Sequence, residues 1–202
     1  MSQVNVASKI MVIRHGEKPP DFGNGVNSKG AQDNESLAVQ GWQRAGGLAT
    51  LFDPARGPLQ DTQLQVPQFI YATAVAKGSS SERPEETIQP LADKLGLTPI
   101  TGPSNAPFTK DDYAAMVTAA VATNGVVLIA WQHEDIPQIA NLILGGNTIQ
   151  DGCWPGSRYD MVWVFNLGSN GQYQPLVQVP QLLLKGDSSK PIDTTKKHKA
   201  QA

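Results

Sequence analysis

The chain has 202 residues and 40% hydrophobic content, which is enough apolar material for one globular domain with a substantial core. The formal net charge is -2, from 16 basic and 18 acidic residues, so the composition provides no general positive field for nucleic acid or an anionic membrane. No stretch approaches the roughly 18 consecutive apolar residues of a membrane span, and residues 1–9 lack the apolar core of a secretory signal, which predicts a cytoplasmic protein.

Apolar runs and helix-like stretches alternate along the chain. In chain order they predict a strand at residues 9–13, a helix at 40–52, a strand at 69–72, helices at 84–95 and 111–123, a strand at 126–131, a helix at 136–144, and strands at 161–166 and 175–179. This alternation predicts an α/β fold, namely a three-layer α/β/α sandwich with a mostly parallel central sheet. The direction of the last two strands is left open.

The connections and the C-terminal segment are polar. Residues 19–35 and 98–109 are long and rich in Gly, Asn, Ser and Pro, which predicts surface loops at the rim of a pocket. From Lys185 onward the chain is polar and charged, and too few apolar residues are present to order it. We therefore expect one domain at residues 1–184 and a flexible tail at residues 185–202.

Three of the expected strands are followed by polar residues that suit an anion. Because the carboxyl ends of parallel strands meet at one edge of a sheet, these residues should lie close together. The second cluster also opens a helix, whose free amide groups favour anions. The three clusters are Arg14-His15-Gly16, Arg83, and His133-Glu134.

Taken in order, these motifs resemble those of the histidine phosphatase superfamily over roughly the first two-thirds of the chain. Arg14-His15-Gly16 is similar to the family signature, and His133 is similar to its second histidine. The segment 37–45 resembles a helix that follows the family's Leu-Thr-x-x-Gly turn, although Ala38 replaces the Thr. The family's Ser-x-x-x-Arg-x-x-x-Thr spacing is matched by Ser79, Arg83 and Thr87.

The resemblance implies a phosphoglycerate mutase-like fold and a phosphomonoester hydrolase that forms a phosphohistidine on His15. Lys18 stands where the acid-phosphatase branch has Arg. The implied partner is a small phosphorylated substrate, with neither nucleic acid nor a membrane, and no metal or other cofactor is required. The implied catalytic residues are His15, His133 and Glu134, and the implied phosphate-binding residues are Arg14, Arg83, Gly16 and Lys18.

The chemistry explains why these residue types are needed. A phosphomonoester dianion repels nucleophiles, so fixed positive charge must surround its oxygens before an attack in line. Arg14 and Arg83 can each present a planar fork to two oxygens. A neutral His15 can then attack phosphorus, and a carboxylic acid can protonate the leaving group. The two imidazoles and two guanidiniums should therefore converge on a space the size of one phosphate.

The proton donor is less well defined by the sequence. Glu134 is favoured, because His133-Glu134 is similar to the His-Asp pair of the acid-phosphatase branch. The short chain without a large inserted helical domain is similar instead to the mutase-like branch, in which the donor follows the second Arg. The other candidates are Asp135, Asp111, Asp112 and Glu85.

Two other functions remain open. A phosphoglycerate-type phosphomutase would use the same motifs, so the sequence does not separate it from a phosphatase. A noncatalytic phospho-ligand binding protein is disfavoured because both His and both Arg are retained. The physiological substrate and the oligomeric state do not follow from the sequence.

Overall fold

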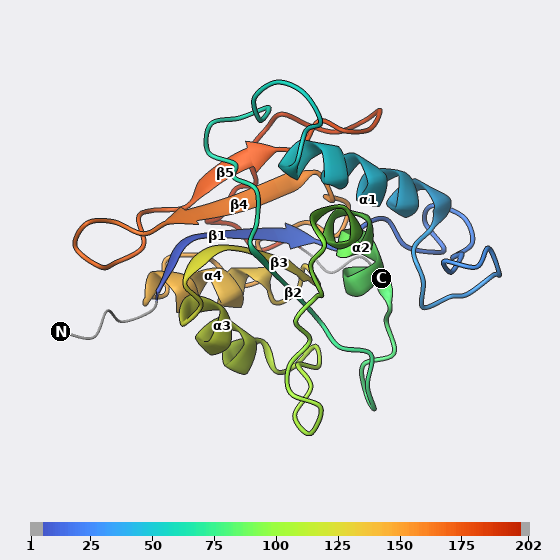
Figure 1. Cartoon of the computed structure of the whole chain (residues 1–202), viewed down its shortest axis with the longest axis horizontal. Helices are drawn as coiled ribbons and strands as arrows, with labels where there is room; N and C mark the ends of the chain where they lie inside the picture. Colours follow the sequence, from blue (N-terminus) through green and yellow to red (C-terminus); the bar gives the residue numbers. More distant parts are fainter. Residues whose placement is uncertain (1–5, 199–202) are drawn as a thin grey trace.

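The computed structural model describes residues 6–198, in which strands and helices alternate along the chain (Figure 1). In chain order they are β1 (Ala7–Arg14), α1 (Val39–Phe52), β2 (Phe69–Ala72), α2 (Arg83–Leu95), α3 (Tyr113–Val121), β3 (Gly125–Trp131), α4 (Ile136–Leu144), β4 (Met161–Asn166) and β5 (Val177–Pro180). Every expected element is present, and each boundary lies within about two residues of the expected one, the usual uncertainty of such boundaries. Within the described residues, no helix is long and apolar enough to cross a membrane.

The central sheet has the strand order β2-β3-β1-β4-β5 and is mixed. β2, β3 and β1 pair in parallel, whereas β1 with β4 and β4 with β5 pair antiparallel. The expectation of a mostly parallel sheet is therefore not confirmed. The reason lies in residues 145–160, which contain no helix and return the chain to the C-terminal end of β1, so that β4 begins opposite Ile13 and runs the other way.

Helices cover both faces of the sheet, as expected for three layers. α1 and α2 lie on one face of the sheet, and α3 and α4 lie on the other (Figure 1). Their apolar side chains form two separate core clusters with the strands. β1 lies in the middle of the sheet and contributes Ile10 and Val12 to one core and Met11 and Ile13 to the other. A strand buried on both faces needs apolar residues at every position, which is why β1 reads as a continuous apolar run.

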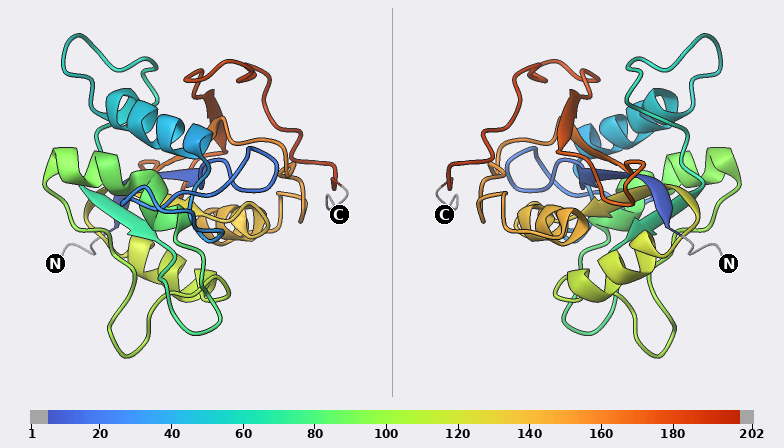
Figure 2. Two further views of the ribbon diagram at one scale, coloured as in Figure 1. Left: turned by 90° about the vertical axis from the view of Figure 1, so that its right-hand side faces the viewer. Right: turned by 90° about the vertical axis from the view of Figure 1, so that its left-hand side faces the viewer.

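The segment after β5 belongs to the fold, so the expectation of a tail outside it is wrong for residues 187–192. Ile192 is 4% exposed and belongs to the core cluster on the face of the sheet that α3 and α4 cover, and Asp187 forms an ion pair with the buried Arg44. Figure 2 shows this segment, in red, passing from β5 toward the loop between α4 and β4. This segment has few apolar residues, and contacts with buried polar residues order it instead. Residues 199–202 of the expected tail lie outside the described residues.

Candidate active site

The predicted site residues lie at the C-terminal edge of the parallel part of the sheet. His15 follows β1, Thr73 follows β2, and His133 and Glu134 follow β3, while Arg83 is the first residue of α2. Since β1, β2 and β3 run in the same direction, these residues reach one edge of the sheet.

Two neighbouring spaces border this edge. A small cavity of about 190 Å³ is lined by His15 and Arg83, among others, and a larger cleft of about 980 Å³ is lined by Arg14 and His133, among others. Lys18 and Glu134 line both spaces, so the two adjoin at these side chains. The small cavity suits a group of a few atoms, whereas the larger cleft has the volume of a site for an entire metabolite. Other residues of the small cavity are Thr73, Ser79, Ser81, Lys110 and Gln132.

His15 is a buried, neutral imidazole with a defined tautomer. It is 5% exposed, and its Nδ1 lies 2.7 Å from the carbonyl oxygen of Gly16. A carbonyl can only accept, so Nδ1 carries the proton and Nε2 keeps its lone pair. Burial lowers the pKa of His15 well below its usual value, and electrostatic interactions with Arg14, Arg83 and His133 lower it further. His15 is therefore uncharged at neutral pH.

Arg14 is held in place by the chain that leads into β4. It is fully buried, its Nη1 donates to the carbonyls of Gly156 (2.5 Å) and Arg158 (3.0 Å), and its Nη2 donates to the hydroxyl of Tyr159 (3.0 Å). The guanidinium also lies 3.7 Å from the centre of the Tyr159 ring. These contacts occupy both terminal nitrogens and fix the side chain beside His15.

Arg83 is held by hydrogen bonds to the loop before α1 and to Ser81, two residues earlier in the chain. Its Nη2 donates to the carbonyl of Asn34 (2.7 Å), and its Nη1 donates to the hydroxyl of Ser81 (3.1 Å). The carboxylate of Glu35 lies 3.6 Å from Nη2, at a position that is about half exposed. Arg83 thus has two polar anchors and a partly solvated counter-ion, and its charge still acts on His15.

Buried polar atoms without a hydrogen-bond partner gather at the site. A buried donor without a partner destabilises a fold by about 1–3 kcal/mol, so such atoms are uncommon in ordinary packing. Three of these atoms belong to Arg14, Arg83 and His133, the residues that lower the pKa of His15. The other two belong to Thr73, which lines the small cavity, and to Gln138, which lines the larger cleft. Among residues 6–198 the five atoms are Nε of Arg14, Oγ1 of Thr73, Nε of Arg83, Nδ1 of His133 and Oε1 of Gln138.

Of the five candidate proton donors, Glu134 is the one that lines the small cavity together with His15 and Arg83. It borders the small cavity, is 60% exposed, and has its Oε2 2.9 Å from Nδ1 of His133, a close contact that is not aligned as a hydrogen bond. Burial would raise the pKa of Glu134, but His133 outweighs burial and lowers it to about 2. Asp135 lines only the larger cleft, and burial raises its pKa. Asp111, Asp112 and Glu85 line neither space.

No family model matches the chain, and no curated protein matches it. Among solved structures, a mycobacterial glucosyl-3-phosphoglycerate phosphatase is similar to the chain, with a TM-score of 0.50 and 14% sequence identity over 84% of this chain and 97% of that one. The chain has a phosphoglycerate mutase-like fold. A phosphoserine phosphatase from Entamoeba histolytica is also similar, with a TM-score of 0.44 and 15% identity over 87% of this chain and 99% of that one.

Within this phosphoglycerate mutase-like fold, Gly16 and Thr87 connect the site to its supports. The amide of Gly16 donates to the hydroxyl of Thr87 (2.8 Å), which donates to the carbonyl of Arg83 (2.6 Å). A Cβ at Gly16 would lie 3.0 Å from the carbonyl oxygen of Gly41 in α1. The small size of Gly16 therefore serves packing against α1, and its amide is already used by Thr87.

Sequence reasoning missed three residues of the site. Thr73 is the first residue after β2, so the rule that polar residues follow buried strands could have found it. Lys110 lines the small cavity from the loop before α3, and Tyr159 holds Arg14 from the loop before β4. Neither loop carries a local pattern that indicates a site, because its path depends on distant contacts. Within the described residues, no group of three or more His, Cys, Asp or Glu side chains is placed to hold a metal ion.

Proposed function

We propose that the chain is a phosphomonoester hydrolase that acts through a phosphohistidine on His15. The observation that carries this proposal is the set of buried nitrogens on Arg14, Arg83 and His133 that make no hydrogen bond, in the same three residues that lower the pKa of His15. The oxygens of a phosphoryl group are acceptors that suit such donors. Positive charge then lies where negative charge develops in the transition state.

In the first step, Nε2 of His15 attacks phosphorus while the bond from phosphorus to the ester oxygen breaks. The leaving oxygen takes a proton from a carboxylic acid, for which we assign Glu134. The products are a phosphohistidine, a free alcohol and an ionised Glu134. Lys18 borders both spaces and can contact the phosphoryl group or the leaving group.

Glu134 must gain a proton before it can act as an acid. Its low pKa comes from His133, so a phosphoryl dianion that takes His133 as its own partner removes this effect. The added negative charge raises the pKa of Glu134 further. Substrate binding therefore favours the protonated acid. In the second step the ionised carboxylate removes a proton from water, which attacks phosphorus and releases phosphate and neutral His15.

The decisive experiment is to trap the covalent intermediate. We expect ³²P-labelled substrate to label the protein at His15 with the acid-labile, base-stable linkage of a phosphohistidine, and p-nitrophenyl phosphate to be hydrolysed in the presence of a chelator. His15→Ala should abolish both. His198→Ala, a change of an exposed histidine at the edge of the larger cleft, should still be labelled. Labelling that persists in His15→Ala would remove His15 from the mechanism.

The same assay separates the other candidate functions. A phosphomutase would exchange the isomers of phosphoglycerate faster than it releases phosphate, because it returns the phosphoryl group to the substrate. A noncatalytic binding protein would bind phosphate and show neither labelling nor hydrolysis.

A further inference from the structure

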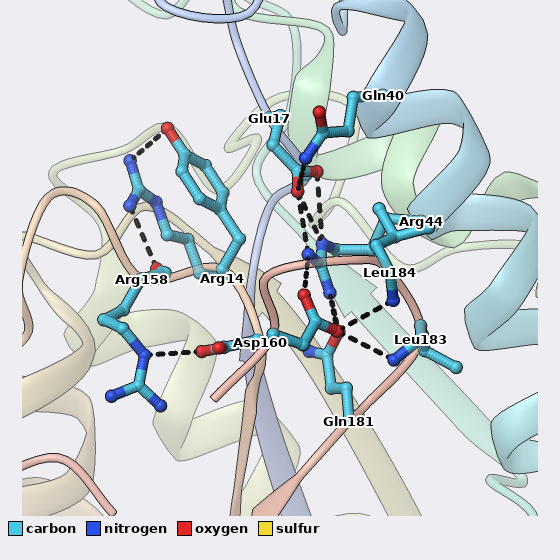
Figure 3. Close-up of polar contacts among 12 residues, drawn as sticks. Arg14, Glu17, Gln40, Arg44, Arg158, Asp160, Gln181, Leu183 and Leu184 are labelled. Atoms are coloured by element: carbon cyan, nitrogen blue, oxygen red, sulfur yellow. Dashed lines mark hydrogen bonds and ion pairs between the residues drawn. The ribbon is translucent and has the colours of Figure 1, made fainter. Parts of the chain in front are cut away.

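A buried chain of ion pairs links Asp187 to the loop after His15. The carboxylate of Asp187 accepts from Nη2 (2.7 Å) and Nη1 (3.1 Å) of Arg44. Arg44 then donates through Nη2 (2.8 Å) and Nε (3.1 Å) to Glu17, two residues after His15 (Figure 3). The three side chains are 2%, 2% and 6% exposed for Arg44, Glu17 and Asp187. One guanidinium thus bridges two carboxylates from distant parts of the chain.

A second chain of contacts starts at the next residue, Ser188, and leads to Arg14. The amide of Ser188 donates to the carboxylate of Asp160 (2.6 Å), which also accepts from Nε of Arg158 (2.6 Å). The carbonyl of Arg158 accepts from Nη1 of Arg14 (3.0 Å). The guanidinium of Arg158 further donates to the carbonyl of Lys190 (2.9 Å). Residues 188–190 thereby hold the loop that anchors the arginine directly before His15.

The two chains of contacts therefore start at the adjacent residues Asp187 and Ser188 and end on the two sides of His15. Arg14 precedes His15 and Glu17 follows it. The contacts that hold these two residues meet at the neighbouring residues Asp187 and Ser188. We infer that Asp187 is a positioning residue for the reaction at His15, acting through Arg44 and Glu17. This inference rests on the proposed function, because it concerns how the imidazole and Arg14 are aligned with phosphorus.

Asp187 also organises its own turn, which gives its carboxylate a fixed direction. Oδ2 accepts from the amides of Leu183 (2.7 Å) and Leu184 (3.1 Å) while it faces Arg44. An Asn at position 187 keeps the size of the side chain, but it loses the charge and one of the two acceptor oxygens. Arg44 then retains Glu17 as its only carboxylate partner, and Glu17 can shift. A shift of about 1 Å near a reacting group can lower a rate by about 100-fold.

The test compares orthovanadate with inorganic phosphate as inhibitors of p-nitrophenyl phosphate hydrolysis. Vanadate adopts the five-coordinate geometry of phosphoryl transfer, whereas phosphate resembles the ground state, so the ratio of their inhibition constants reports alignment. The ratio does not depend on how much of the protein is folded. For Asp187→Asn we expect vanadate to bind about 10-fold more weakly and phosphate to change less than about twofold.

The matched control is Asp193→Asn, which removes an exposed carboxylate of the same segment, paired at the surface with Lys196. It should leave both inhibition constants unchanged. If Asp187→Asn does not fold, Arg44→Lys takes its place, because a lysine keeps the charge but cannot bridge two carboxylates with a planar fork. A vanadate-to-phosphate ratio equal to that of the wild type would overturn the inference and leave the proposed function intact. Wild-type protein that neither hydrolyses the ester nor binds vanadate would overturn both.

Discussion

At the scale of single residues, the properties of His15 follow from its surroundings. Burial lowers the pKa of His15, as do the neighbouring Arg14, Arg83 and His133, and this keeps the imidazole neutral, while the carbonyl of Gly16 selects the tautomer that leaves Nε2 without a proton. A nucleophile of this kind needs no base to remove a proton before it attacks. The same charges that keep it neutral are those that we propose bind the phosphoryl group.

The lowered pKa of His15 leads to a prediction about pH. Protonation of His15 would stop the attack on phosphorus, so this limb of the pH profile of kcat/KM should lie below pH 6.5, the usual pKa of histidine. Arg83→Ala removes one of the positive charges and should move the pKa of His15 upward. Proton NMR titration of the ligand-free protein measures this pKa, with His198→Ala used for assignment. A His15 that titrates at its ordinary value would contradict the prediction.

The role of Glu134 is tested through the leaving group. An acid matters most when the departing oxygen is a strong base, so Glu134→Gln should slow hydrolysis of an alkyl phosphate by about 100-fold or more. Hydrolysis of p-nitrophenyl phosphate, which has a good leaving group, should slow far less. Asp135→Asn is the matched control, because Asp135 is the next residue and lines only the larger cleft. Equal slowing of both substrates by Glu134→Gln would assign the acid to another residue.

At the scale of elements, α1 supports the loop that carries His15 and Glu17. A Cβ at Gly41 would lie 2.5 Å from the carbonyl oxygen of Glu17, whereas a Cβ at Gly46 in the same helix would meet nothing within 4 Å. We expect Gly41→Ala to lower the free energy of unfolding by about 1–3 kcal/mol and to reduce kcat. Gly46→Ala should raise the free energy of unfolding by about 0.5–1 kcal/mol. Urea titration of both variants measures the difference, and equal effects would show that the Gly41 contact is unimportant.

The elements themselves could be predicted from the sequence because their signals are local. The buried runs at β1, β2 and β3 and the helix-like stretches between them require no knowledge of distant contacts. Because the carboxyl ends of parallel strands meet at one edge of a sheet, the positions of these strands also predicted that Arg14, His15 and His133 lie at the same edge. The direction of β4 could not be predicted, because it depends on the path of residues 145–160. Tyr159, which anchors Arg14, lies on that path and was missed for the same reason.

At the scale of the whole molecule, a segment of polar composition proves to be structural. Asp187 pairs with Arg44 across 143 residues of sequence, and a count of apolar residues cannot detect such a pair. Burial would raise the pKa of Asp187, but Arg44 outweighs burial and lowers it. The ion pair therefore stabilises the fold fully above pH 3.8, the value for the unfolded chain, and this contribution is lost as the pH falls through the lower folded-state pKa. Wild type and Asp187→Asn should accordingly differ in stability at pH 7 and converge at strongly acidic pH.

Ile192 provides the sharpest test that this segment folds with the rest of the molecule. It is 4% exposed and belongs to the core cluster on the face of the sheet that α3 and α4 cover, whereas Leu142 on α4 is 47% exposed. If residues after 185 formed an independent tail, Ile192→Ala would leave stability unchanged. We expect it instead to lower the free energy of unfolding by about 2–4 kcal/mol, as for a buried aliphatic side chain, and Leu142→Ala to change it by less than about 0.5 kcal/mol. Urea unfolding followed by tryptophan fluorescence measures both values. A single transition with a lowered midpoint for Ile192→Ala would place the segment in the same cooperative unit as the site, because Trp163 lies in the core cluster that Ile192 joins.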